Sequence, residues 1–130
     1  GGTDAVPKGL PVKGEITRGF TEEHPGVDIA APLGSPVVAT ARGVVAEVDT
    51  DEVLGLFVRV KHPSGYETVY GHLQRSYVKP GQKVLAGDLV GAVGESGRTS
   101  GPHLHYAVYK NGKPVPWDSL TSTPTPRGGG

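Results

Sequence analysis

The chain has 130 residues, and its 13 lysines and arginines balance 13 aspartates and glutamates, so its formal net charge at pH 7 is zero. This balance argues against nucleic acid or an anionic membrane as a partner held by bulk electrostatics. No apolar run approaches the roughly 18 residues of a membrane span, and no cysteine is present to form disulfides or thiolate zinc sites. The length suits one domain with a single core.

We expect the chain to divide into three parts. These are a linker or loose lead-in at residues 1–13, a domain at 14–118 and a flexible tail at 119–130. The 21 glycines and 12 prolines of the chain mostly separate alternating apolar segments, which favours short strands over helices. The predicted fold class is therefore all-β, a compact antiparallel sandwich or barrel-like domain. We expect strands at approximately 15–20, 27–30, 36–40, 43–50, 56–62, 66–73, 84–86, 88–93, 103–109 and 114–117.

His24 and Asp28 are the first candidate site residues along the chain. Their spacing would align them on a helix, but the intervening Pro25 and Gly26 argue against one. In an extended chain they would lie about 13 Å apart. They can therefore share one ion only if the segment turns, which Gly26 permits. An ordinary loop pair is the alternative interpretation.

Two more histidines follow in the middle of the chain. His62 precedes a Pro-Ser-Gly turn, and we interpret it as a residue that flanks the turn or supports a neighbouring site residue. Strict alternation places His72 on the same strand face as Tyr70, at the end of the strand, where a side chain can lean over a cleft. A strand-end histidine without a binding role is the alternative.

The segment from 103 to 109 carries a pair of histidines on one predicted strand face. Leu104, Tyr106 and Val108 alternate with His103 and His105, so the apolar three are expected to face the core. Two imidazoles side by side suggest a ligand site or an acid–base site. They form a metal site only if other ligands arrive from elsewhere in the chain, and a surface pair is the alternative.

The chemistry of zinc connects these residues. Catalytic zinc commonly takes three protein ligands from His and Asp or Glu, and it keeps a fourth position for water. His24, Asp28 and one member of the pair His103 and His105 would supply such a set. The other member and His72 would then be available as base and oxyanion stabiliser.

Three separated motifs resemble those of the lysostaphin-like (LytM-type) zinc endopeptidases. The first spans residues 24–37, the second is Tyr70-Gly71-His72-Leu73, and the third spans residues 97–106 with its His-Leu-His sequence. A Pro-Gly-containing turn at 78–84 also matches. The resemblance covers about residues 14–118, and three motifs in the order of the family make it specific.

The resemblance implies a compact β fold with a groove whose floor carries one zinc ion per chain. It implies hydrolysis of peptide cross-links in bacterial cell-wall peptidoglycan, whose peptides would be the partner of the domain. The metal ligands that the resemblance implies are His24, Asp28 and His105.

The same resemblance assigns further roles around the metal. It makes His103 the favoured general base, and it makes His72 the group that polarises the water or steadies the oxyanion. It also places three residues near the substrate groove: Tyr70, Thr99 and Ser100.

Some questions stay open in the sequence. Residues 19–23 lack the arginine that relatives often carry before the first motif, which leaves part of the groove wall unassigned.

A non-catalytic peptidoglycan-binding or amidase-activating module is the main alternative function. A biotinyl-like carrier would need a lysine at a hairpin tip, and the matching turn has none. The cleaved bond, Gly–Gly or D-Ala–diaminopimelate, is also open.

The oligomeric state and the cellular location are expected from the resemblance alone. We expect a monomer that acts outside the cytoplasm, whether secreted, periplasmic or associated with the cell wall. The chain itself shows no signal peptide pattern.

Overall fold

The structure is a computed structural model that describes residues 5–97, 99 and 101–120. The described chain ends in a short 3-10 helix, η2 (Trp117–Leu120), which the sequence analysis did not anticipate. Each predicted strand is present, with ends that differ by a few residues, so the all-β prediction is confirmed. The strands are β1 (Glu15–Arg18), β2 (Val27–Ala30), β3 (Pro36–Val38), β4 (Gly43–Asp51), β5 (Gly55–Lys61), β6 (Tyr66–Ser76), β7 (Lys83–Val84), β8 (Leu89–Val93), β9 (His103–Lys110) and β10 (Lys113–Val115).

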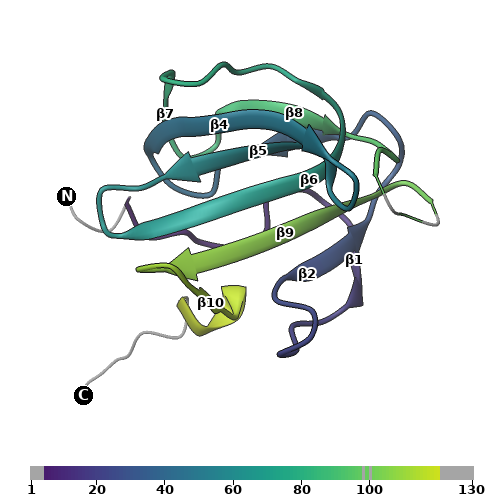
Figure 1. Cartoon of the computed structure of the whole chain (residues 1–130), viewed down its shortest axis with the longest axis horizontal. Coiled ribbons are helices and arrows are strands. Elements are labelled where there is room, and N and C mark those ends of the chain that lie inside the picture. The colour runs from purple at the N-terminus through teal and green to yellow at the C-terminus, as the bar shows by residue number, and fades with distance from the viewer. Residues whose placement is uncertain (1–4, 98, 100, 121–130) are drawn as a thin grey trace.

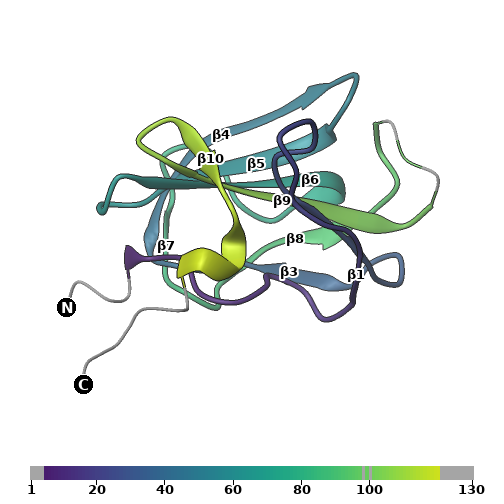
Figure 2. The ribbon, with the colours of Figure 1, turned by 90° about the horizontal axis from the view of Figure 1, so that it is seen from below.

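The strand pairs within the described residues are all antiparallel, and neighbours follow the order β1-β2-β9-β6-β5-β4-β7 (Figure 1). β10 extends β9, while β8 pairs with both β3 and the far end of β6. The long β6 thus belongs to two parts of the sheet, and Figure 2 shows β3 and β8 as a layer below β6 and β9. The result is a sandwich-like, open sheet.

The core lies between these layers and follows the alternation of the strands. In β9, Leu104, Tyr106 and Val108 are at most 2% exposed, whereas His103 and His105 are only partly buried on the opposite face. Fully burying one such apolar side chain contributes about 1.5–3 kcal/mol. The prediction for the two faces of β9 is therefore confirmed, and the histidines lie on the face that points away from the core.

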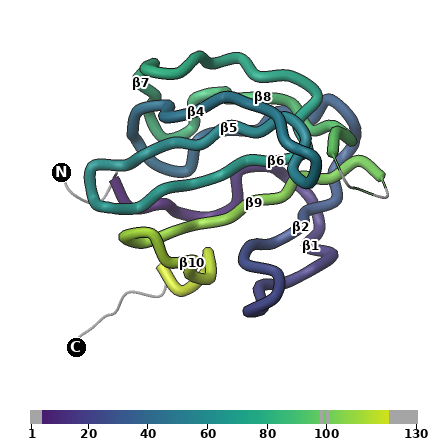
Figure 3. Tube along the Cα trace, in the orientation of Figure 1, coloured from purple at the N-terminus to yellow at the C-terminus, as the bar shows by residue number. Residues whose placement is uncertain are grey.

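The segment before β1 packs along the core. Figure 3 shows it crossing behind β6 and β9 on its way to β1. Val12 is 7% exposed and Leu10 packs against the same cluster. The amide of Val38 donates to the carbonyl of Pro11 at 2.9 Å, which ties this segment to β3. In the described part of the chain, no helix has the length and apolarity needed to cross a bilayer.

His62 is buried on the core side of the sheet and takes part in a chain of polar contacts. Its Nδ1 lies 2.8 Å from the carbonyl oxygen of Arg42, and its Nε2 lies 2.9 Å from Thr68 Oγ1. A carbonyl only accepts, so Nδ1 carries the proton and Nε2 accepts from the threonine hydroxyl. Burial lowers the pKa of His62 below its ordinary 6.5. The Arg42 carbonyl and the charge of Glu67 raise this pKa and offset part of the shift.

The chain of polar contacts continues under the neighbouring strands. Because the Thr68 hydroxyl donates to His62, it accepts from the hydroxyl of Tyr70 at 2.7 Å. The Tyr70 oxygen accepts from the amide of Thr40 at 3.3 Å, and Thr40 Oγ1 lies 2.7 Å from the hydroxyl of Tyr106. These buried polar groups are thus satisfied by one another, which limits the cost of burying them.

We expect His62 to make stability sensitive to acid. With its folded pKa below 6.5, the folded chain binds fewer protons at this site than the unfolded chain, so the free energy of unfolding falls as pH drops below about 6.5. The substitution His62→Gln should remove this part of the pH dependence. It should also cost about 1–3 kcal/mol at neutral pH, because a buried partner is left unpaired.

Urea unfolding of both proteins over a series of pH values measures this effect. The contributions of the other histidines cancel in the difference between the two curves. Parallel curves from pH 8 to pH 5 would contradict the expectation.

Candidate metal centre

The pairing of β2 with β9 brings the first two ligand candidates together. Asp28 and His105 are direct cross-strand partners, and such partners point to the same face of a sheet. His105 Nδ1 lies 3.0 Å from Asp28 Oδ1. Two residues that are 77 positions apart in sequence are thus placed side by side by regular β pairing alone.

His24 reaches the same carboxylate from a tight turn before β2. The backbones of Thr21 and His24 exchange two hydrogen bonds, of 3.0 and 3.2 Å, and the Thr21 hydroxyl also accepts from the His24 amide. The ring Nδ1 lies 3.2 Å from the carbonyl of Gly19, so Nδ1 carries the proton and Nε2 is free to approach Asp28 Oδ1 at 3.3 Å. The turn that the shared site required is present.

Gly26 makes this turn possible for two reasons. Its φ of 140° lies in a region that side chains other than glycine rarely adopt. A Cβ at this position would also lie 2.8 Å from the carbonyl oxygen of Tyr106 and 2.9 Å from Cε1 and Nε2 of His105. Any larger residue would therefore press on the ring that lies beside Asp28.

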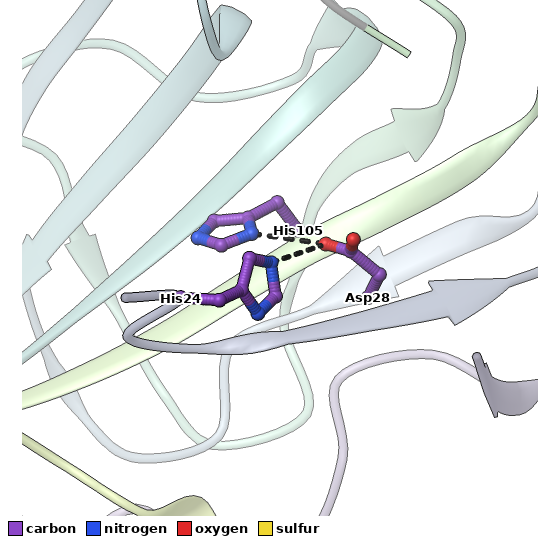
Figure 4. Close-up of side chains that lie close together, drawn as sticks. All are labelled: His24, Asp28 and His105. Atoms are coloured by element: carbon purple, nitrogen blue, oxygen red, sulfur yellow. Dashed lines mark hydrogen bonds and ion pairs between the residues drawn. The ribbon is translucent and has the colours of Figure 1, made fainter. Parts of the chain in front are cut away.

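The resulting cluster fits a divalent metal ion. One ligand atom each from His24, Asp28 and His105 lies within 4.8 Å of the others, and Figure 4 shows both rings directed at the same carboxylate oxygen. Burial raises the pKa of Asp28, but the hydrogen bond and charge of His105, with the other nearby imidazoles, bring it below its ordinary 3.8. Two imidazoles and one ionised carboxylate are a donor set that zinc accepts.

His103 lies next to these three residues on the same strand face. Its Nδ1 lies 2.8 Å from the carbonyl of Gly101, so this nitrogen carries the proton. Its Nε2 is 4.0 Å from Asp28 Oδ2. Thr99 Oγ1 lies 2.9 Å from Nδ1 and 3.1 Å from Nε2, which places Thr99 against this ring.

His72 differs from its sequence-based placement. Strict alternation predicted the face of Tyr70, but His72 has a φ of 63°, in the left-handed region, and this turns its side chain to the opposite face. Its ring centroid lies 5.2 Å from that of His103 and 6.2 Å from that of His105. The prediction for its face was wrong, and the local backbone is the physical reason.

The ring of His72 is held by the loop before β9. Its Nδ1 donates to the carbonyl of Ser96 at 2.8 Å. The hydroxyl of the same serine donates to the carbonyl of Leu73 and accepts from the amide of Leu56. Burial lowers the pKa of His72 below its ordinary 6.5, and the neighbouring imidazoles lower it further. The Ser96 carbonyl and the charge of Asp28 raise this pKa and offset part of the shift.

A groove of about 420 Å³ runs over these groups. We call five of the residues that line it the His/Asp cluster: His24, Asp28, His72, His103 and His105. The walls contain residues that the sequence analysis did not identify. Arg18, Glu23 and Tyr109 are polar, whereas Val53 and Leu54 form an apolar side.

The three residues predicted near the groove fall in different places. Tyr70 is fully buried and hydrogen bonds on the core side, so the structure places it on the other face of the sheet. Thr99 contacts His103, as described above. Ser100 lies outside the described residues.

Comparison with known proteins identifies relatives. The model of the family described as peptidase family M23 matches residues 22–117. The peptidoglycan DD-endopeptidase ShyC of Vibrio cholerae serotype O1 is 41% identical over 102 residues, which are 78% of this chain and 22% of that protein. Two further curated relatives are the peptidoglycan DD-endopeptidase ShyA of Vibrio cholerae and the DD-carboxypeptidase/endopeptidase Mpg of Neisseria meningitidis, each 42% identical. The chain spans less than a quarter of the length of ShyC, ShyA and Mpg.

Solved structures agree with the sequence relatives. A zinc-containing peptidase from Vibrio cholerae has a TM-score of 0.83 and 34% identity, over 86% of this chain and 39% of that chain. Lysostaphin from Staphylococcus simulans has a TM-score of 0.71 and 27% identity, over 98% of this chain and 58% of that chain. The resemblance to lysostaphin-like enzymes is thus confirmed, and the chain belongs to peptidase family M23.

Proposed function

We propose that this domain is a zinc-dependent endopeptidase that hydrolyses peptide cross-links of bacterial peptidoglycan. The observation that carries the proposal is the His/Asp cluster, which combines three candidate metal ligands and two further imidazoles that line one groove. The names of the relatives support the substrate, since ShyC and ShyA are called peptidoglycan DD-endopeptidases. A module that only binds peptidoglycan would not need the complete cluster.

One zinc ion per chain would be held by His24, Asp28 and His105. When bound, zinc supplies Lewis-acid polarisation of the scissile carbonyl and lowers the pKa of a bound water to about 7. Hydrogen bonds support this ligand set, because the Gly19 carbonyl fixes the tautomer of His24. Partners of this kind orient ligands and are worth about 10–100-fold in metal affinity.

His103 is proposed as the general base. Its Nδ1–H donates to the Gly101 carbonyl, so Nε2 keeps a lone pair on the side of Asp28. It would take a proton from the attacking water. The same nitrogen would then return the proton to the leaving amine as the C–N bond breaks.

His72 is proposed as the second imidazole of the reaction. With Nδ1 committed to the Ser96 carbonyl, its Nε2 is an acceptor in the neutral ring and can orient the water. If this ring, in place of His103, takes the proton of the attacking water, its Nε2–H would then donate to the developing oxyanion. Ser96 thereby acts as a positioning residue, because its hydroxyl ties the loop to β5 and β6 while its carbonyl holds the ring.

Of the two bonds left open by the sequence, the D-Ala–diaminopimelate cross-link is the better candidate for the cleaved bond. Relatives named DD-endopeptidases are about 40% identical to this chain, whereas lysostaphin is 27% identical. We further propose residues 14–118 as the catalytic domain, acting as a monomer. Its location would be outside the cytoplasm, where peptidoglycan is found.

Two substitutions separate metal binding from proton transfer. His105→Ala should lose both zinc and activity, because it removes a ligand. His103→Ala should keep one zinc per chain and lower turnover by roughly 10²–10⁴-fold, because it removes the positioned base. Elemental analysis and a muropeptide assay on the same preparations measure both. A His103→Ala protein without zinc, or a His105→Ala protein that retains it, would refute this division of roles.

Gly26→Ala should weaken zinc binding, because the new methyl group meets both the His105 ring and the Tyr106 carbonyl. The new methyl group would displace the His105 ring, and we expect an affinity loss on the order of 10–100-fold. Competition with a chromophoric chelator measures it. Gly19→Ala is the matched control, because a Cβ there meets no atom within 4 Å in the same loop. Equal zinc affinities for the two variants would show that Gly26 does not position the ligand.

Digestion of purified sacculi tests the reaction itself. We expect release of uncross-linked muropeptides from sacculi with D-Ala–diaminopimelate cross-links, and loss of this release after treatment with a chelator. Sacculi with glycine cross-bridges should be cut poorly. Mass analysis of the products identifies the bond. Binding to sacculi without any release, in zinc-loaded protein, would favour the non-catalytic module instead.

A further inference from the structure

We propose that Arg18 binds a carboxylate of the substrate, on the side of the scissile bond that leaves as the amine. This inference deepens the proposed function and rests on it. It assigns a direction to the bound peptide, because Arg18 and an apolar wall come from strands on opposite sides of β9. Arg18 lies on β1, and the apolar wall consists of Val53 and Leu54 in the turn between β4 and β5.

The register of β1 places Arg18 on the face of the cluster. Arg18 is the cross-strand partner of Asp28, which in turn is the partner of His105. An irregularity in the β1–β2 register between Ile16 and Arg18 sets this pairing. Without it, Thr17 would lie opposite Asp28, and Arg18 would point to the other face. The bulge therefore directs a guanidinium toward the groove, one strand away from the carboxylate that would hold the metal.

The charge of Arg18 has no partner within the described chain. No ion pair or side-chain hydrogen bond joins it to a described carboxylate, although Glu23 and Asp28 line the same groove. Arg59 shows the contrast, because Glu47 and Glu67 hold its guanidinium at 3.0 Å on each side. A guanidinium presents donors in a planar fork that matches a carboxylate. Arg18 is thus available for an anionic group that enters the groove.

The chemistry of the proposed cross-link supplies such a group. In a D-Ala–diaminopimelate bond, the carbon that bears the scissile nitrogen also bears a free carboxylate. That carboxylate therefore stays close to the reacting carbonyl, on the amine side. Binding at Arg18 would place the amine half of the peptide over β1 and β2, and the acyl half toward Leu54 in the β4–β5 turn.

The apolar wall is held in place by its own contacts. Asp51 accepts from the amides of Val53 and Leu54, and the Leu54 carbonyl accepts from the amide of His72. A Cβ at Gly71 would lie 2.9 Å from Leu54, so this side chain already covers the strand. Arg18 is the single lysine or arginine among the described residues that line the groove, which makes it the candidate for binding an anion.

The assignment is tested by measuring peptide binding to a variant that does not hydrolyse its substrate. The parent would be the zinc-loaded His103→Ala chain, and the probes would be two synthetic cross-linked peptides. One carries the free carboxylate next to the scissile nitrogen, and the other carries a carboxamide there. We expect Arg18→Gln to weaken binding of the carboxylate peptide by roughly 10–100-fold, with less than a twofold change for the carboxamide. Arg18→Lys should recover part of the loss.

Arg75→Gln is the matched control, because Arg75 is an exposed arginine that does not line the groove. It should change neither affinity. Equal effects of Arg18→Gln on both peptides, or no effect on either, would overturn the assignment while the proposed function stands. If the parent binds neither peptide and the unsubstituted zinc-loaded chain cuts neither, the proposed function fails and the role of Arg18 fails with it.

Discussion

The pairing of β2 with β9 is the constraint on which the site depends. It sets Asp28 opposite His105 and, by the same register, sets Ile29 opposite Leu104. The second pair is fully buried. Because side chains alternate, a slip of one residue would move the ligands into the core and expose the apolar pair. The residues that stabilise the sandwich therefore also hold Asp28 and His105 in register.

Regular strand geometry alone brings together only part of the cluster. His24 depends on a turn at Gly26, and His72 depends on a left-handed residue within β6. Each departure has a local support: the Thr21–His24 hydrogen bonds for the turn, and the Leu54 and Ser96 carbonyls for His72. Backbone in such regions persists only when its surroundings fix it. The rigid sheet thus supplies the frame, and two irregular positions complete the arrangement.

Much of this could be predicted from the sequence because it depends on local pattern. The alternation of residues 103–109 identified the correct face for His103 and His105, and Gly26 marked the turn that His24 needs. The face of His72 was wrong because alternation assumes a regular backbone. Arg18 was missed because its direction depends on a bulge relative to a partner strand, and Leu54 was missed because a turn folds it over Gly71.

The groove has one further property, which follows from where its parts come from. The ligand candidates Asp28 and His105 lie on central strands, whereas Arg18 belongs to the edge strand β1 and Leu54 to a hairpin turn. In the proposed function, the residues for chemistry and the residues for selectivity therefore lie in separate stretches of chain. Exchange of the β4–β5 turn or of residues around Arg18 would then change the preferred cell-wall peptide while the proposed metal ligands stay in place. An engineer could graft these two borders between relatives independently of the core.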